Sequence, residues 1–87
     1  MAPSDRPAFH TRLRTIRTER GLSRKDLAAA VDVHYQTIGY IERGEYSPSL
    51  DLALRICREF GLPVEALFSL DPFPQLDAAT STGNPER

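Results

Sequence analysis

Apolar residues recur along this chain with the spacing of helices, and the residues between them mark where those helices end. Phe9, Leu13 and Ile16 fall at positions i, i+4 and i+7, which is one face of a helix. Pro7 suits the first turn of such a helix because its missing amide hydrogen would have no partner there, and Gly21 is favourable just past the end. The pattern predicts a first helix that begins near Pro7 and ends before Gly21.

A longer helix is predicted over residues 50–60. Pro48 disfavours helix in the preceding loop, Ser49 is a good N-terminal cap, and Gly61 is a good stop. The expected buried face consists of Leu50, Ala53, Leu54, Cys57 and Phe60, with Ile56 at its edge. A short fifth helix is expected at 63–68, and the prolines and small polar residues after it are typical of a tail.

Residues 23–44 predict two further helices joined by a tight turn. Ser23 and Asp26 have the spacing at which a hydroxyl and a carboxylate cap a first helical turn. Asp32 tolerates the left-handed backbone of a turn, and Gly44 supplies a stop. The inward faces are Leu27, Ala28 and Val31 in one helix and Ile38 and Ile41 in the other. This is the pattern of a helix-turn-helix, and the residues left outside on its second helix are Tyr35, Gln36, Gly39, Tyr40 and Arg43.

The length of 87 residues and the apolar fraction of 40% suffice for one small domain with a modest core. We expect an all-α fold of five helices, with a tail at residues 1–6, the domain at 7–70 and a second tail at 71–87. The single cysteine excludes an internal disulfide, and no apolar stretch has the length of a membrane span or a signal peptide. These features predict a cytoplasmic protein that does not bind a membrane.

The formal net charge of −1 hides an uneven distribution. Between Arg6 and Lys25 the single acid is Glu19, and the basic residues are Arg6, Arg12, Arg14, Arg17, Arg20, Arg24 and Lys25. From Glu45 to Asp77 the bases are Arg55 and Arg58, and the acids are Glu45, Asp51, Glu59, Glu65, Asp71 and Asp77. Such a chain can be neutral overall and still present a positive face to a polyanion.

The reactive side chains do not favour an enzyme or a metalloprotein. Cys57 falls on the apolar face of the helix at 50–60, where a free cysteine is usually a small core residue. His10 and His34 are single and far apart, which does not support a zinc site with three or four ligands. We therefore expect no catalytic residues, no metal and no cofactor.

Three stretches, LRTIRTERGLSRKDLA, QTIGYIERG and SPSLDLALRICREFGLPVEALF, resemble the XRE family of lambda-repressor-like DNA-binding domains over residues 9–70. The resemblance implies a five-helix domain whose second and third helices form the helix-turn-helix. It also implies a sequence-specific transcriptional regulator, with a repressor as the expected type, that reads the major groove of double-stranded DNA with the helix at 35–43. The family includes phage repressors, restriction-modification controllers and antitoxins.

The resemblance assigns roles to individual positions. The base-reading positions would be Tyr35, Gln36, Gly39 and Tyr40. The phosphate ligands would be Ser23, Arg24, Arg43 and Ser47, and a structural ion pair would join Arg17 to Glu42. Gln36 is the preferred reader because its amide donates and accepts at once, which matches the edge of adenine. Two alternatives stay open, since exposed tyrosines can be ordinary surface residues and Arg17 can be one more cation facing the groove.

Three positions depart from the family's pattern. Arg24 stands where glutamine is common, and an arginine there would add a phosphate contact. His34 stands where a hydroxyl residue often caps the helix, which predicts a weaker helix start. Gly39 stands where the family often has a reading side chain, so either the helix approaches the bases closely or that contact is lost.

A single domain of this size covers only about 600–1,000 Å² of DNA interface, so we expect a homodimer on DNA. The candidate dimer interface consists of Phe68, Leu70, Phe73 and Leu76. The alternative function is a protein-interaction module of the same fold, such as the antitoxin of a toxin–antitoxin pair, whose C-terminal tail contacts a protein partner.

Overall fold

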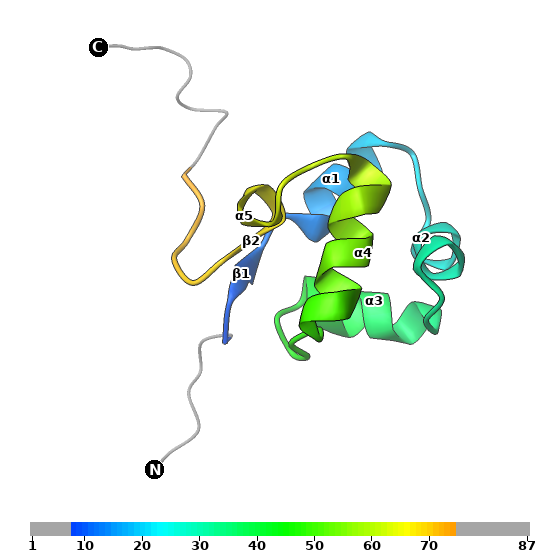
Figure 1. Cartoon of the computed structure of the whole chain (residues 1–87), viewed down its shortest axis with the longest axis horizontal. Helices are drawn as coiled ribbons and strands as arrows, with labels where there is room; N and C mark the ends of the chain where they lie inside the picture. Colours follow the sequence, from blue (N-terminus) through cyan, green and yellow to red (C-terminus); the bar gives the residue numbers. More distant parts are fainter. Residues whose placement is uncertain (1–7, 75–87) are drawn as a thin grey trace.

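The chain folds as five helices and one two-stranded antiparallel sheet (Figure 1). This computed structural model describes residues 8–74. In chain order the elements are β1 His10–Thr11, α1 Leu13–Glu19, α2 Arg24–Val31, α3 Tyr35–Glu42, α4 Leu50–Phe60, α5 Val64–Leu67 and β2 Phe68–Ser69. The predicted five-helix, all-α fold with a helix-turn-helix in its second and third helices is confirmed. Within residues 8–74, no helix combines the length and the apolarity needed to span a membrane.

The helix-turn-helix has the local capping that the sequence predicted. The Ser23 hydroxyl accepts the Asp26 amide and the Ser23 amide donates to the Asp26 carboxylate, both at 2.9 Å. The Ser23 amide first, and its hydroxyl second, lower the pKa of the Asp26 carboxyl. Asp32 has a left-handed φ of 63° in the turn, and Gly44 has a φ of 74° after α3. The cap marks the start of α2, Asp32 forms the turn between the two helices, and Gly44 marks the end of α3.

The first helix begins at Leu13 rather than near Pro7, so this part of the prediction was wrong. Residues of β1 are extended because they pair with β2, with Thr11 opposite Phe68. The Thr11 hydroxyl then accepts the Leu13 amide at 3.1 Å at the start of α1. Phe9 reaches the core from the extended segment, its ring centroid 6.0 Å from that of Phe68. A long-range strand pairing therefore overrides the local helical pattern.

The buried face of α4 is rotated relative to the prediction. Leu52 and Ile56 are buried, whereas Leu50 and Leu54, which we expected in the core, are 72% and 50% exposed. The positions predicted correctly as buried are Ala53, Cys57 and Phe60. Both stripes have helical spacing, so periodicity alone could not choose between them. The choice follows from the packing of α4 against α2 and α5.

The fifth helix is shorter than predicted by one residue at each end, because Pro63 is the N-terminal cap of α5 and Phe68 belongs to β2. Beyond the sheet, Leu70 is 83% exposed, while Phe73 is half-buried with the Arg12 guanidinium 5.5 Å from its ring centre. Leu76 lies outside the described residues, as do residues 1–7 and all of 75–87. The expected domain and tail boundaries therefore stay predictions.

Candidate nucleic-acid interface

One face of α3 carries exposed polar and aromatic side chains. Tyr35 is 39% and Tyr40 is 46% exposed, and Gln36 between them in the sequence is exposed as well. His34 Nδ1 accepts the Gln36 amide at 3.1 Å, and the His34 ring stacks on Tyr35 with centroids 4.6 Å apart. The helix start therefore has a side-chain cap that the sequence did not predict, and the cap orients the first two residues of this face.

Gly39 is buried, contrary to the expectation that it is exposed. Two guanidinium groups cover it, since a Cβ built on Gly39 would lie 3.2 Å from Arg43 Nη1 and 3.7 Å from Arg24 Nε. In sequence Gly39 lies one helical turn after Tyr35, so it occupies the middle of the exposed face of α3. Because Gly39 has no side chain, the guanidinium groups of Arg24 from α2 and of Arg43 from the end of α3 have room to lie over it.

Replacing Gly39 with alanine is expected to raise the free energy of unfolding by about 1 kcal/mol, because alanine is the better helix former. The close neighbour, Arg43 Nη1, is the end of a flexible and half-exposed side chain that can move aside. Thermal unfolding should show a rise of about 4–8 °C in Tm. Gly21→Ala is the matched control and should lose stability, because Gly21 has a φ of 72°. A lower Tm for Gly39→Ala would show that the cation over α3 cannot yield.

The carboxylate of Glu42 joins α3 to both preceding helices. Arg17 Nε lies 2.6 Å from Glu42 Oε2, and Arg24 Nε lies 3.0 Å from Glu42 Oε1. Arg17 also donates from Nη1 to the Leu22 carbonyl at 2.8 Å. The Glu42 side chain is 1% exposed and that of Arg17 is 10% exposed, whereas that of Arg24 is 41% exposed. Arg17 therefore acts within the fold rather than as a free cation at the surface, and Arg24 stands between the core and the solvent.

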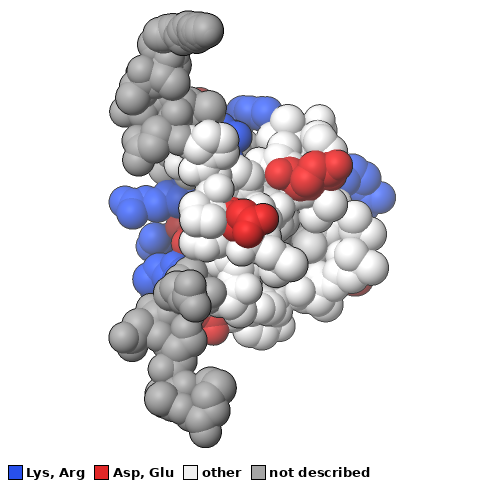
Figure 2. Space-filling view, turned by 90° about the vertical axis from the view of Figure 1, so that its left-hand side faces the viewer, with Lys and Arg blue, Asp and Glu red and all other residues white. Residues whose placement is uncertain are grey.

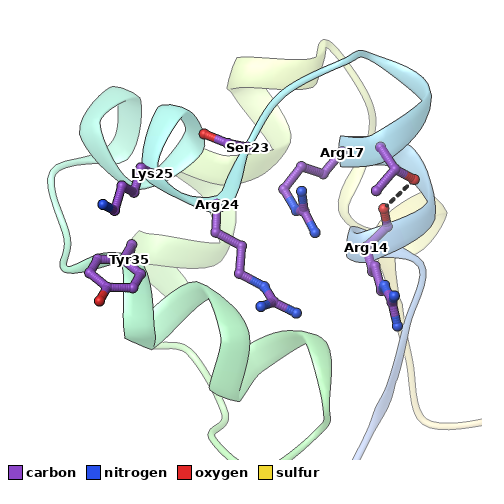
Figure 3. Close-up of a pocket in the computed structure, with 7 residues that line it drawn as sticks. Arg14, Arg17, Ser23, Arg24, Lys25 and Tyr35 are labelled. Atoms are coloured by element: carbon purple, nitrogen blue, oxygen red, sulfur yellow. Dashed lines mark hydrogen bonds between the residues drawn. The ribbon is translucent and has the colours of Figure 1, made fainter.

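A basic hollow of about 490 Å³ opens between α1, α2 and α3 (Figure 3). Its lining residues are Arg14, Arg17, Thr18, Ser23, Arg24, Lys25 and Tyr35. Lys25 Nζ lies 5.1 Å from the centre of the Tyr35 ring, which ties the start of α2 to the start of α3. Arg14 and Lys25 were not among the predicted site residues, although the basic run near the start of the chain pointed to them. The hollow concentrates positive charge beside the exposed face of α3.

The remaining predicted phosphate ligands lie in three places: Ser23 lines the basic hollow, Arg43 lines a smaller hollow on α3, and Ser47 lines a separate hollow elsewhere. Arg43 Nε is 3.2 Å from Glu45 Oε1, and its guanidinium is 5.2 Å from the centre of the Tyr40 ring. Ser47 is exposed in the loop that follows. Ser23 is exposed too, and its oxygen already accepts the amide that caps α2. Each of these groups is accessible to an anion without a change in the backbone.

A different surface of the molecule is apolar. Figure 2 shows the side of the molecule that lies on the left of Figure 1, where Lys and Arg lie toward the margins and the middle is mostly uncharged, with acidic residues among the uncharged ones. The exposed apolar residues of α4, α5 and the following segment are Leu50, Leu54, Val64 and Leu70. A hollow of about 370 Å³ lies among Phe9, Pro48, Leu50, Val64 and Leu70. The exposure of Leu50 makes this apolar surface larger than the sequence predicted.

Catalytic and metal chemistry have little support in residues 8–74. Cys57 is 4% exposed, and burial, followed by the charge of Glu65, raises the pKa of its thiol, so the thiol stays protonated at neutral pH. Within the same residues, no group of three or more His, Cys, Asp or Glu side chains is placed to hold a metal ion. The charged groups that line the basic hollow are all cations, which suit an anionic ligand.

Comparison with known proteins gives consistent similarities. Residues 13–67 match the sequence profile of the helix-turn-helix family HTH_3. An uncharacterized HTH-type transcriptional regulator of Methanothermobacter thermautotrophicus is 48% identical over 64 residues, which are 72% of this chain and 93% of that protein. The transcriptional repressor RstR of the cryptic phage CTXphi of Vibrio cholerae is 30% identical over 61 residues, 70% of this chain and 55% of that protein. The crystal structure of the restriction-modification controller protein C.AhdI from Aeromonas hydrophila aligns with a TM-score of 0.60 and 31% identity over 63% of this chain and 83% of that one.

Proposed function

The chain belongs to the HTH_3 helix-turn-helix family and is a DNA-binding transcription regulator, and we propose that it represses transcription by placing α3 in the major groove of a specific duplex. The observation that carries the proposal is the joining of the exposed face of α3 to the basic hollow. A recognition helix needs groups that contact base edges in the groove and cations that hold the phosphates on either side of it. Both kinds of group lie here on one continuous surface.

The exposed face of α3 supplies the base contacts. Gln36 offers a donor and an acceptor from one rigid amide, which matches N7 and the N6 amino group of adenine. Tyr35 and Tyr40 place rings against thymine methyl groups and hydroxyls within reach of phosphate oxygens. Their place on the same helix as Gln36, beside the cations of Lys25 and Arg43, supports this role over that of ordinary surface residues.

The phosphate contacts come from the groups around α3. Lys25 lies beside Tyr35 at the start of α3, Arg14 lines the opposite side of the basic hollow from α1, and Arg43 and Ser47 follow at the end of α3 and in the next loop (Figure 3). The Ser23 hydroxyl still has its hydrogen to donate, because the contact with Asp26 uses the oxygen as acceptor. Cations on both sides of the helix allow it to lie across the groove with both DNA strands held.

Repression is the regulatory outcome that we propose. A domain seated in the major groove of a promoter excludes other proteins from that stretch of DNA. The similarity to the phage repressor RstR supports this direction of control.

A salt titration tests the proposal. Binding to random duplex DNA, followed by fluorescence polarisation, should weaken steeply as salt rises, with a slope of about −0.9 per phosphate contacted. A selection from a random duplex pool should then yield a preferred sequence. Binding without a salt slope would contradict the proposal and favour a protein-interaction module of the same fold.

We further propose that the DNA-bound form is a homodimer, and that the second copy covers the apolar surface formed by Leu50, Leu54, Val64 and Leu70. A soluble domain rarely exposes several adjacent large apolar side chains unless a partner covers them. Two copies would also double the contact with DNA over two half-sites one helical turn apart. The predicted interface residues Phe68 and Phe73 are only half-buried against Phe9 and Arg12, so they would lie at the border of this surface.

Introducing charge on this surface is expected to weaken dimerisation at least tenfold, because each glutamate would have to be desolvated in the interface. Leu50→Glu with Leu70→Glu is the informative variant, since both side chains are largely exposed and the monomer should keep its Tm. Sedimentation or light scattering measures the mass, with Ala30→Glu on the exposed side of α2 as control. A second variant that ends before Pro72 measures how much Phe73 and Leu76 contribute to dimerisation. A mass that neither variant changes would place the dimer contact elsewhere.

A further inference from the structure

The side chain of Arg24 belongs to α2 but lies on α3. Figure 3 shows it reaching from the start of α2 to the neighbouring helix. Its Nε lies 3.0 Å from Glu42 Oε1, and its Nε and Cδ lie 3.7 and 3.8 Å from the position that a Cβ of Gly39 would occupy. Arg24 therefore contacts the middle of the exposed face of α3 instead of pointing sideways toward the flank of the domain.

The buried carboxylate of Glu42 holds the Arg24 guanidinium in place through its Nε. The Glu42 side chain is 1% exposed, and Arg17 donates to both of its oxygens, from Nε to Oε2 at 2.6 Å and from Nη2 to Oε1 at 3.3 Å, so its orientation is set by the core. Arg24 uses only Nε for this contact, and within residues 8–74 no hydrogen bond engages its Nη1 or Nη2. The two terminal nitrogens form the end of a flat fork, with two parallel N–H donors available to one ligand.

The fork borders a hollow of about 150 Å³ on the exposed face of α3. The residues that line it are Arg24, Tyr35, Gln36, Gly39, Tyr40 and Arg43. The hollow is deep at Gly39 because this residue has no side chain to fill it. When a recognition helix enters the major groove, groups at the middle of its outward face meet base edges, and groups at its flanks meet phosphates. The position of this hollow therefore places the Arg24 fork opposite a base.

We propose that Arg24 reads a guanine, supplying from α2 the base contact that α3 lacks at Gly39. The inference rests on the proposed function, because it takes α3 to be the helix in the groove. The guanidinium has donors only, and guanine is the base whose major-groove edge presents two adjacent acceptors, N7 and O6. Adenine presents one acceptor and one donor, so it cannot engage both nitrogens. The pairing with Glu42 holds the fork in place before DNA arrives, which favours a specific contact over a mobile one.

Arg43 is the matched contrast within the same hollow. It also lies over Gly39, but its partners Glu45 and Tyr40 are both exposed, so nothing buried fixes its orientation. A mobile cation of this kind is suited to phosphate oxygens, which are present at every base pair. Arg24→Gln and Arg43→Gln are thus the same chemical change at two neighbouring sites with different expected effects.

A double-mutant cycle between protein and DNA tests the assignment. After a preferred duplex is selected, each of its guanines is replaced in turn by 7-deazaguanine, which lacks the N7 acceptor. Wild-type protein should lose about tenfold or more in affinity at one guanine of each half-site, and Arg24→Gln should lose about as much on the unmodified duplex. Arg24→Gln on the modified duplex should lose no more than either change alone, whereas the losses for Arg43→Gln should multiply.

Losses that multiply for Arg24→Gln at every guanine would overturn the assignment. An equal loss for Arg24→Gln on the preferred duplex and on a scrambled duplex would also overturn it, because Arg24 would then contact a phosphate and not a base. Tm measurements on each variant separate these results from a loss of folding. The failure of the proposed function has a different signature, since no preferred duplex would emerge from the selection and no salt slope would be seen.

Discussion

Replacing Glu42 with alanine is expected to lower the free energy of unfolding by about 3–5 kcal/mol. The carboxylate is 1% exposed and lies 2.6 Å from Arg17 Nε, in a side chain that is itself 10% exposed. Removing it leaves the Arg17 guanidinium buried without a counter-charge, which costs more than the intact pair contributes. A domain of this size has a total stability on the order of 4–13 kcal/mol. The loss should therefore remove a large share of the total stability and lower the Tm accordingly.

Arg24 should add little to this cost, because 41% of its side chain is exposed and water can solvate the charge once Glu42 is gone. Urea or thermal unfolding followed by circular dichroism measures the change. Glu42→Gln is the matched control and should lose less, since the amide keeps the shape and one acceptor. The pair Arg17→Met with Glu42→Leu should recover most of the stability, because no buried charge remains. Arg17→Met and Glu42→Leu are also measured separately. If their two losses of stability simply add in the double variant, the side chains do not depend on one another.

Replacing Gln36 with alanine is expected to weaken binding to the preferred duplex by roughly 1–3 kcal/mol and to leave binding to a scrambled duplex nearly unchanged. An amide on a base edge meets a different set of donors and acceptors at each of the four base pairs, so its loss should appear only where the correct base stood. Tolerance in a repeated selection should widen mainly at one base pair of each half-site.

Arg43→Ala provides the contrast for Gln36→Ala. A guanidinium on a phosphate meets the same oxygens at every base pair, so this change should weaken both duplexes alike and lower the salt slope by about one. The measurement is a pair of titrations for each variant at three salt concentrations. Equal weakening of both duplexes by Gln36→Ala would mean that the helix starting at Tyr35 is not the base-reading element.

The features that were predictable from the sequence are those fixed within a few residues. The capping of α2 by Ser23 and Asp26, the left-handed turn at Asp32 and the stop at Gly44 are local, and the structure has all three. The start of α1 was not predictable in this way, because Thr11 is extended only through a partner far along the chain. The buried face of α4 depends likewise on its neighbours, since two stripes of equal periodicity compete.

The features of the candidate site also divide into those that local sequence predicts and those that depend on tertiary contacts. The exposed residues of α3 follow from its helical spacing, and the basic run near the start of the chain indicates the charge of the hollow. The cover over Gly39 could not be predicted, because it depends on how far Arg24 and Arg43 reach and on which carboxylates hold them. The cap at His34 was missed because an imidazole nitrogen is an uncommon acceptor at that position.

The pairing of β1 with β2 has a consequence for synthesis on the ribosome. The Thr11 hydroxyl donates to the Leu67 carbonyl across 56 positions of the chain, so the first element to emerge must wait for nearly the last. All five helices can form while this clasp is open, and Phe9 stays without its aromatic neighbour until Phe68 has left the exit tunnel. Closing so long a segment costs more chain entropy than any turn within the domain. A nascent chain that stalls once α4 has left the exit tunnel would therefore carry a complete helix-turn-helix while β1 is still without its partner strand.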